Sequence, residues 1–306
     1  MKVGTSEVSG ANGANLVIGQ SGASNDLLSL DVNTTNTYIA TESGSSGGWG
    51  GGPTDGGYIG STKAIKVMGP ITVNSGNIHL STKSDGAEGL ESKYTITFNG
   101  GIFESDTYDD AINAANCITF NDGCYVWAHA SGNDAIDSNS SSGTNGIVVN
   151  GGVVVSTSTT SPEEAFDCDN ANFVLNGGVI IGVGGSQGGG GGTSTAGAPT
   201  SASQKYGIVS GVSLTQNTYI SVKNSSNTVL CNYKQPNSFS SSGGMGGMGG
   251  SSGGVNILVS HPNLGSSATV TYNATSVSGT TGSVWNGVYT TGGTASGGTS
   301  TSATIY

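Results

Sequence analysis

Short apolar segments recur along the chain at nearly regular intervals, and each leads into a turn that contains glycine. The turn glycines lie 25, 22, 29 and 26 residues apart, at Gly76, Gly101, Gly123, Gly152 and Gly178. Apolar side chains stand five and three residues before each glycine, at Ile71 and Val73, Ile96 and Phe98, Ile118 and Phe120, Ile147 and Val149, and Phe173 and Leu175. Apolar positions two residues apart predict a short strand with one face directed inward.

A repeat of this length predicts one coil of a β-solenoid. A single coil cannot bury its apolar side, but stacked coils form a continuous core, as in a parallel β-helix. The composition agrees, because 55 Gly and many Ser, Thr and Asn residues separate short runs of Val, Ile and Phe. We therefore expect an all-β protein built around a parallel β-helix.

The pattern divides the chain into three parts. Residues 1–57 hold short apolar runs and end in a Gly-rich stretch, which predicts an N-terminal cap followed by an exposed loop. The coils should occupy residues 58–187. Residues 188–306 alternate again between apolar and polar positions, with Gly-rich loops between them, and predict a C-terminal β cap over the open end of the solenoid.

A second repeated column lies upstream of these strands, and it is acidic. Each coil has a carboxylate, a small residue, an apolar residue and a second oxygen-bearing side chain, as in Asp110-Ala111-Ile112-Asn113 and Asp134-Ala135-Ile136-Asp137. The window from residue 85 to 169 holds 14 of the 19 acidic residues, so the carboxylates should form a stripe along the solenoid. We name as candidate metal ligands Asp85, Glu88, Glu91, Asp109, Asp110, Asn113, Asp134, Asp137, Glu163, Glu164, Asp167 and Asp169.

Stacked coils would bring these carboxylates close together. Equivalent positions on neighbouring coils should lie roughly 4.8 Å apart, where unpaired charges repel each other. Ca²⁺ accepts oxygen ligands at roughly 2.4 Å, about half that spacing, so one ion could bridge two coils. The alternative is ordinary turn chemistry, because Asp and Asn side chains also bond to nearby backbone groups without any metal.

The same repeats resemble a known family. The segments "SDGAEGLES…ITFNGG", "DDAIN…ITFNDG" and "NDAIDS…IVVNGG" are similar to those of secreted bacterial carbohydrate-binding β-helix proteins related in structure to the family 9 polysaccharide lyases. The resemblance extends over most of the chain from about residue 58 onward. It implies a right-handed parallel β-helix, bound calcium and affinity for plant cell-wall polysaccharide.

Charge and cysteine content narrow the possible partners. The formal net charge is −11 and all eight basic residues are Lys, so no basic surface for nucleic acid is expected. The beginning of the chain shows neither a signal-peptide core nor a membrane span, and the composition is typical of an extracellular or cell-surface protein. Cys117, Cys124, Cys168 and Cys231 have no metal-ligand spacing, and Cys124 is expected to be a buried free thiol.

The favoured function is calcium-dependent, non-catalytic binding of pectate-type or cellulose-type polysaccharide. Trp127 lies four residues after its turn glycine, where the other coils carry mostly small residues, and is the preferred aromatic platform, although it could also fill a gap in the core. Tyr125 and Lys93 are further candidates for sugar binding. Self-assembly into an extracellular fibre or coat is the first alternative, and a calcium-dependent lyase with Lys93 as its base is the second.

Overall fold

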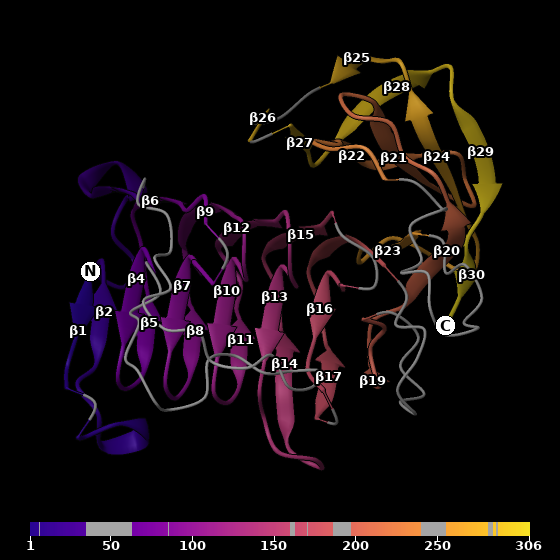
Figure 1. Ribbon diagram of the computed structural model, residues 1–306. Helices are drawn as coiled ribbons and strands as arrows, with labels where there is room; N and C mark the ends of the chain where they lie inside the picture. The colour runs from indigo at the N-terminus through magenta and orange to yellow at the C-terminus, as the bar shows by residue number, and fades with distance from the viewer. Residues whose placement is uncertain are drawn as a thin grey trace, which may run out of the picture.

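The computed structural model describes residues 1–5, 7–34, 63–84, 86–159, 163–169, 171–185, 197–239, 255–280, 284–285 and 287–306. Three sheets of mainly parallel strands run along a solenoid, and an antiparallel sheet stands over its C-terminal half (Figure 1). Five turns separate the first strand of sheet A from its last. The prediction of an all-β parallel solenoid with a C-terminal β cap is therefore confirmed.

Each coil contributes one strand to each of the three sheets. Sheet A consists of β1 (Lys2–Val3), β4 (Ile65–Val67), β7 (Leu90–Ser92), β10 (Ile112–Ala114), β13 (Ile136–Ser138) and β16 (Phe166–Asp167). Sheet B consists of β2 (Leu16–Ile18), β5 (Ile71–Val73), β8 (Ile96–Phe98), β11 (Ile118–Phe120), β14 (Asn145–Val149), β17 (Asn172–Leu175) and β19 (Ser201–Ala202). The parallel part of sheet C consists of β3 (Ser29–Asn33), β6 (Asn77–Ser81), β9 (Gly101–Thr107), β12 (Cys124–Ala130), β15 (Val153–Ser158) and β18 (Val179–Gly184).

The C-terminal strands continue and cover the solenoid. Sheet C is extended by antiparallel strands β23 (Val255–Ser260), β20 (Tyr206–Val212) and β30 (Thr304–Ile305). A separate sheet, here called sheet D, contains β26 (Val284–Trp285), β27 (Val288–Tyr289), β22 (Val229–Lys234), β21 (Tyr219–Asn224), β24 (Ala268–Ala274) and β29 (Thr299–Ser302). Strands β25 (Ser276–Thr280) and β28 (Gly292–Ser296) form a two-stranded antiparallel sheet.

Helix is nearly absent from the described residues. Two 3₁₀ turns, η1 (Gly10–Asn12) and η2 (Asn25–Leu27), lie between the strands of the first coil. Within the described ranges, no helix is long and apolar enough to cross a membrane.

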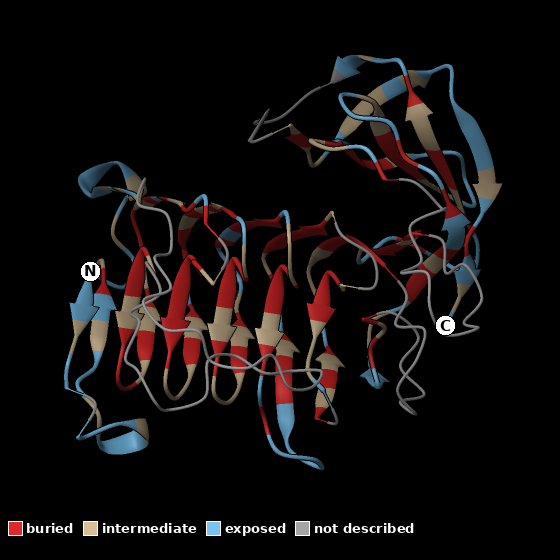
Figure 2. Ribbon diagram, in the orientation of Figure 1, coloured by how far each residue is buried: buried red, intermediate tan, exposed pale blue. Residues whose placement is uncertain are grey.

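The repeated apolar columns form the core of the solenoid. The ten residues predicted to point inward from β5, β8, β11, β14 and β17 are all buried and lie in register with one another (Figure 2). In sheet A, Leu90, Ile112, Ile136 and Phe166 fill the interior in the same way. Stacking of equivalent side chains, such as the parallel rings of Phe98 and Phe120 with centroids 5.2 Å apart, gives the coils a common register.

Each turn glycine follows an asparagine two residues earlier, and these asparagines form a ladder. The Nδ2 atom of each donates to the Oδ1 atom of the preceding one at 2.8 to 3.0 Å, through Asn74, Asn99, Asn121, Asn150 and Asn176. The glycine is required by backbone geometry at Gly152, where φ is 80° and a Cβ atom would lie 2.6 Å from the Sγ atom of Cys124. Cys124 is a buried free thiol, as expected.

Two details differ from the expectation. The solenoid starts ahead of residue 58, because β1, β2 and β3 pair in parallel with β4, β5 and β6. The "NDG" turn also shifts the register by one residue, so that Cys124, not Gly123, pairs with Gly101. Trp127 therefore aligns with Glu104 in the outward column of sheet C, and Ala128 occupies the inward column of small residues. The predicted Gly-rich loops fall largely outside the described residues.

Candidate functional site

The acidic stripe follows one outer column of sheet A and the turns that lead into it. Lys2, Lys66, Glu91, Asn113, Asp137 and Asp167 occupy equivalent positions on successive strands. The column therefore carries lysines on β1 and β4, a glutamate on β7, an asparagine on β10 and aspartates on β13 and β16. Adjacent strands in a sheet lie about 4.8 Å apart, so each side chain of the column is close to the side chains at the same position on the neighbouring strands.

At β7 the carboxylates are balanced by lysines. Lys63 Nζ lies 2.5 Å from Glu88 Oε1, and Lys66 Nζ lies 2.9 Å from Glu91 Oε2. Lys93 forms a second ion pair with Glu91. Burial alone would raise the pKa of Glu91, but the hydrogen bonds from Lys66 and Lys93 outweigh it and lower that pKa below its ordinary value.

Glu88 is balanced less completely. Burial raises its pKa to about 7 against the opposing effect of Lys63, with smaller contributions from the nearby Glu91 and Asp109 carboxylates. Its Oε2 atom is buried and has no hydrogen-bond partner among the described residues.

Beyond Lys93 the stripe contains no lysine up to residue 169. The Nδ2 atom of Asn113 donates to Asp110 Oδ2 and to Asp137 Oδ2, at 2.8 Å in each case. Asp110 is 3% exposed, and its Oδ1 atom is buried without a hydrogen-bond partner among the described residues. Burial first, and then the carboxylates of Asp137 and Glu88, raise the pKa of Asp110 well above its usual range.

The next two coils extend this lysine-free group. Burial and the neighbouring Asp167 carboxylate raise the pKa of Asp137 to about 8 and that of Asp134 well above its ordinary value. The Oδ1 atom of Asp134 accepts a hydrogen bond from the backbone N–H of Glu164, a buried residue. Carboxylates in such surroundings are stabilised by protons or by a bound cation.

The remaining candidates lie at the rim of this group. Burial, followed by the effect of Asp167, raises the pKa values of Glu163 and of Asp169. The Asp169 backbone N–H donates to Asp167 Oδ1 at 2.8 Å, and Asp109 Oδ1 accepts from Asn133 Nδ2 at 2.7 Å. Some of the acids therefore do take part in ordinary Asx hydrogen bonding. Asp85 lies outside the described residues.

The donor set suits a hard cation. Carboxylate and amide oxygens are the ligands that Ca²⁺ prefers, and buried oxygens without partners are suitable ligand atoms. In the part of the chain that the structure describes, no three His, Cys, Asp or Glu side chains already surround a common point. An ion held here would therefore require side chains to turn toward a common point.

The predicted sugar-binding residues occupy different environments. Trp127 is only 8% exposed and belongs to a second core between sheets C and D, where its Nε1 atom donates to Tyr233 Oη at 3.2 Å. The ring is thus a packing element, which agrees with the alternative that it fills the core. Tyr125, two residues earlier on the same strand, is 39% exposed. Lys93 stands beside Glu91 in the acidic stripe.

The sequence prediction did not include the lysines that balance Glu88 and Glu91. Lys63 and Lys66 precede their partners by 25 residues, the same interval that separates Gly76 from Gly101. Applying the repeat length to the basic residues, and not only to the acidic ones, would have identified both pairs.

Comparison with known protein families identifies a similarity over part of the chain. A family of carbohydrate-binding domain-containing proteins matches residues 11–131, which run from the residues before β2 through the end of β12. No curated protein and no solved structure matches this chain. The matched segment contains the β7 and β10 parts of the acidic stripe and the first four strands of sheet C.

Proposed function

We propose that this chain is an extracellular, calcium-stabilised β-helix protein that binds plant cell-wall polysaccharide without catalysis. The observation that carries the proposal is the match of residues 11–131 to a carbohydrate-binding family, on a parallel β-solenoid. Low charge density, many Ser, Thr and Asn residues and the absence of Arg are in keeping with an extracellular role.

Calcium has a structural part in this proposal. Asp110, Asp134, Asp137 and Asp167 would supply its ligands, because they lie on successive coils in the region without lysine. The ion would compensate the repulsion between these carboxylates and link neighbouring coils. Because it would bind the folded chain only, it would add its binding free energy to stability.

Lys93 has no catalytic part in this proposal. Removal of a ring proton requires a base that is free to accept it, whereas the Lys93 side chain is engaged in an ion pair with Glu91. The residue instead balances a carboxylate that is 2% exposed.

The polysaccharide proposal is tested by sedimentation of the full chain with insoluble cellulose and with calcium pectate gel. We expect the protein to be retained on at least one polymer at millimolar calcium, and its binding to pectate to require calcium. If neither polymer retains the protein and electron micrographs show ordered fibres, the proposal is wrong and a structural role replaces it.

The calcium proposal has its own test. Isothermal titration with Ca²⁺ should show binding by the wild type that is lost or strongly weakened in Asp137→Asn. Asp26→Asn is the matched control, because Asp26 is exposed and lies in η2, outside the stripe. Equal losses in both variants would mean diffuse electrostatic attraction and would contradict a site.

A further inference from the structure

The outer face of sheet C divides into an open polar half and a covered apolar half. One outward column consists of Asp31, His79, Glu104, Trp127, Val155 and Ile181, in register on six successive strands. From Trp127 onward the column is buried in the core beneath sheet D. On β3, β6 and β9 the same column is polar and reaches solvent.

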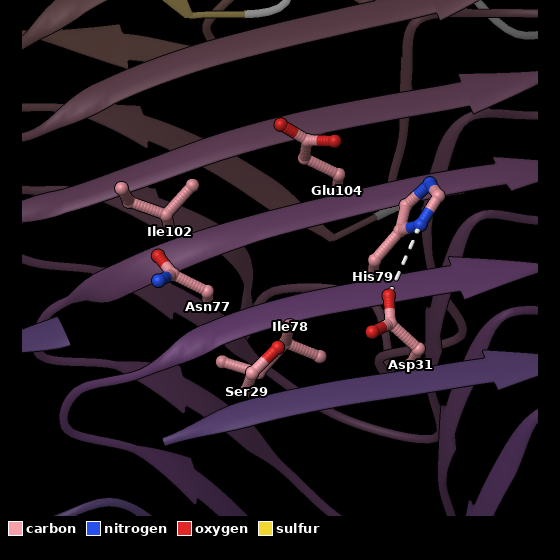
Figure 3. A pocket seen from close by; sticks show the side chains of 7 residues that line it. All are labelled: Ser29, Asp31, Asn77, Ile78, His79, Ile102 and Glu104. Carbon is pink, nitrogen blue, oxygen red and sulfur yellow. Dashed lines mark ion pairs between the residues drawn. The ribbon is translucent and has the colours of Figure 1, made fainter. Parts of the chain in front are cut away.

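A pocket of about 330 Å³ lies on the polar half. Figure 3 shows the outward side chains that line it on three adjacent strands, namely Ser29, Asp31, Asn77, His79, Ile102 and Glu104. Asp31 and His79 face each other across neighbouring strands, with Oδ1 and Nδ1 3.4 Å apart (Figure 3). Glu104 stands on the next strand of that column, so three polar groups succeed one another along the solenoid.

An aromatic ring stands next to this pocket. Tyr125 continues the neighbouring outward column after Ser29, Asn77 and Ile102, with which it is in register. It is 39% exposed, in contrast to Trp127 on the same strand. Tyr125 and Ile102 therefore give the pocket an apolar margin, beside a row of hydrogen-bonding groups.

This combination matches the surface of a sugar ring. Pyranose rings present apolar C–H faces, which pack on aromatic rings, and equatorial hydroxyls, which bond to carboxylates, amides and imidazoles. Adjacent strands lie about 4.8 Å apart, close to the length of one residue in an extended β-linked glycan. A chain lying across the strands would meet one polar side chain of the column with each successive sugar residue.

The negative charge of the pocket favours neutral glycans over uronate chains. Its column carries two carboxylates, Asp31 and Glu104, and the next outward column carries Asp106, whose partner is Lys83 at 2.8 Å. A uronate chain would bring further negative charge to this face and be repelled. A neutral glycan would meet only hydrogen-bond acceptors and donors.

We propose that the outer face of β3, β6, β9 and β12 is a binding site for a neutral, β-linked glycan, with Asp31, His79 and Glu104 bonding to hydroxyls and Tyr125 stacking on a ring. The inference rests on the proposed polysaccharide function and assigns it a location distinct from the acidic stripe. The covered half of the sheet sets the far limit of the site, since sheet D packs on the column from Trp127 onward.

The test compares variants of the full chain on insoluble cellulose and with soluble β-linked gluco-oligosaccharides. Tyr125→Ala and Glu104→Ala should each weaken binding about tenfold, because loss of one stacking or hydrogen-bonding contact costs about 1.4 kcal/mol. Tyr108→Ala is the matched control, since Tyr108 is a similarly exposed tyrosine that does not line the pocket. Its affinity should stay within twofold, and the melting temperatures of all the variants should match that of the wild type.

The outcomes separate this inference from the general function. If the wild type binds cellulose and neither Tyr125→Ala nor Glu104→Ala weakens that binding, the site is elsewhere and this inference is wrong, while polysaccharide binding stands. If Tyr125→Ala reduces retention on calcium pectate as much as on cellulose, the preference for neutral glycans is wrong. If the wild type binds no polysaccharide at all, the proposed function fails together with the site.

Discussion

The acidic stripe has two regions that are built on the same repeat and balanced in opposite ways. Around β7, Glu88 and Glu91 are paired with Lys63, Lys66 and Lys93. From β10 to β16 the equivalent positions carry Asn113, Asp137 and Asp167, with no lysine in that stretch of sequence. The pKa of Glu91 is lowered, whereas those of Asp110, Asp134 and Asp137 are raised.

This difference shows that the repeat alone does not determine how charge is compensated. The lysine-paired region contains its own counterions, which balance Glu91 fully and Glu88 in part. The lysine-free region needs protons or a cation from solution, because buried carboxylates without a partner are costly. Stability of the second region should therefore depend on calcium and pH, and stability of the first region should not depend on calcium.

Removal of calcium should have the largest effect. A site that is saturated a thousandfold above its Kd contributes about 4 kcal/mol, so excess chelator should lower the melting temperature by about 5 to 10 °C. Hydrogen exchange measured before and after chelation should increase in β13 and β16, and remain unchanged in β4 and β7. Uniform loss of protection along the solenoid would contradict the division into two regions.

Lys66→Met should have the next largest effect. It leaves the buried Glu91 with Lys93 as its remaining partner, which should lower the free energy of unfolding by about 2 kcal/mol. Lys83→Met is the control, because the Lys83–Asp106 pair is largely exposed and should contribute less than about 1 kcal/mol. Denaturant melts should show the same loss in calcium and in chelator. Rescue of Lys66→Met by calcium would mean that the two regions are not independent.

The pH dependence should follow the carboxylates whose pKa values are raised, which occur in both regions. Asp137 and Glu88 have folded pKa values of about 8 and about 7, above their ordinary values of 3.8 and 4.5. The folded chain therefore holds protons that the unfolded chain has released, and this stabilisation is complete in acid and disappears as the pH rises through the folded pKa values. Thermal melts of metal-free protein should show a lower melting temperature at about pH 8 than at about pH 5.

Two contrasts check the origin of that effect. Calcium should raise the melting temperature more at about pH 8 than at about pH 5, because it binds ionised carboxylates. Glu91 acts in the opposite direction, since its lowered pKa gives stability that is lost in acid. A metal-free melting temperature that rises between these two pH values would contradict the raised pKa values of Asp137 and Glu88.

Much of the solenoid could be predicted from local pattern. The alternation at Ile96 and Phe98, repeated on each coil, identifies both the strand and its inward face, because a one-residue shift would expose every apolar side chain. The asparagine ladder was present in the sequence two residues before each turn glycine and could have been found by the same alignment. The first coil was missed because the interval from Ile18 to Val73 is 55 residues, more than twice the usual repeat.

The functional surfaces depended on information that the pattern does not contain. Trp127 was the preferred sugar platform, with filling of the core as the alternative, and the extra residue in its turn places it in the outward column with Glu104. It is buried there because sheet D packs on that column and contacts it through Tyr233, more than 100 residues later. The pocket on sheet C likewise depends on the parallel pairing of β3 with β6, and hence on a first coil that the sequence analysis did not identify.

The smallest and most selective change is Asp137→Asn, which places an amide next to the amide of Asn113. It removes one carboxylate from the lysine-free region without altering side-chain volume. The electrostatic repulsion between the carboxylates that remain there, which include Asp110 and Asp167, should therefore decrease. Metal-free protein should become slightly more stable at about pH 8, by less than about 1 kcal/mol, while the stabilisation by calcium is lost.

Glu91→Gln, the corresponding change in the lysine-paired region, should instead destabilise the protein with and without calcium, because it leaves Lys66 and Lys93 without their shared carboxylate. Denaturant melts of both variants, in calcium and in chelator, measure this difference in sign, and two variants of the same sign would mean that the stripe behaves as a single region.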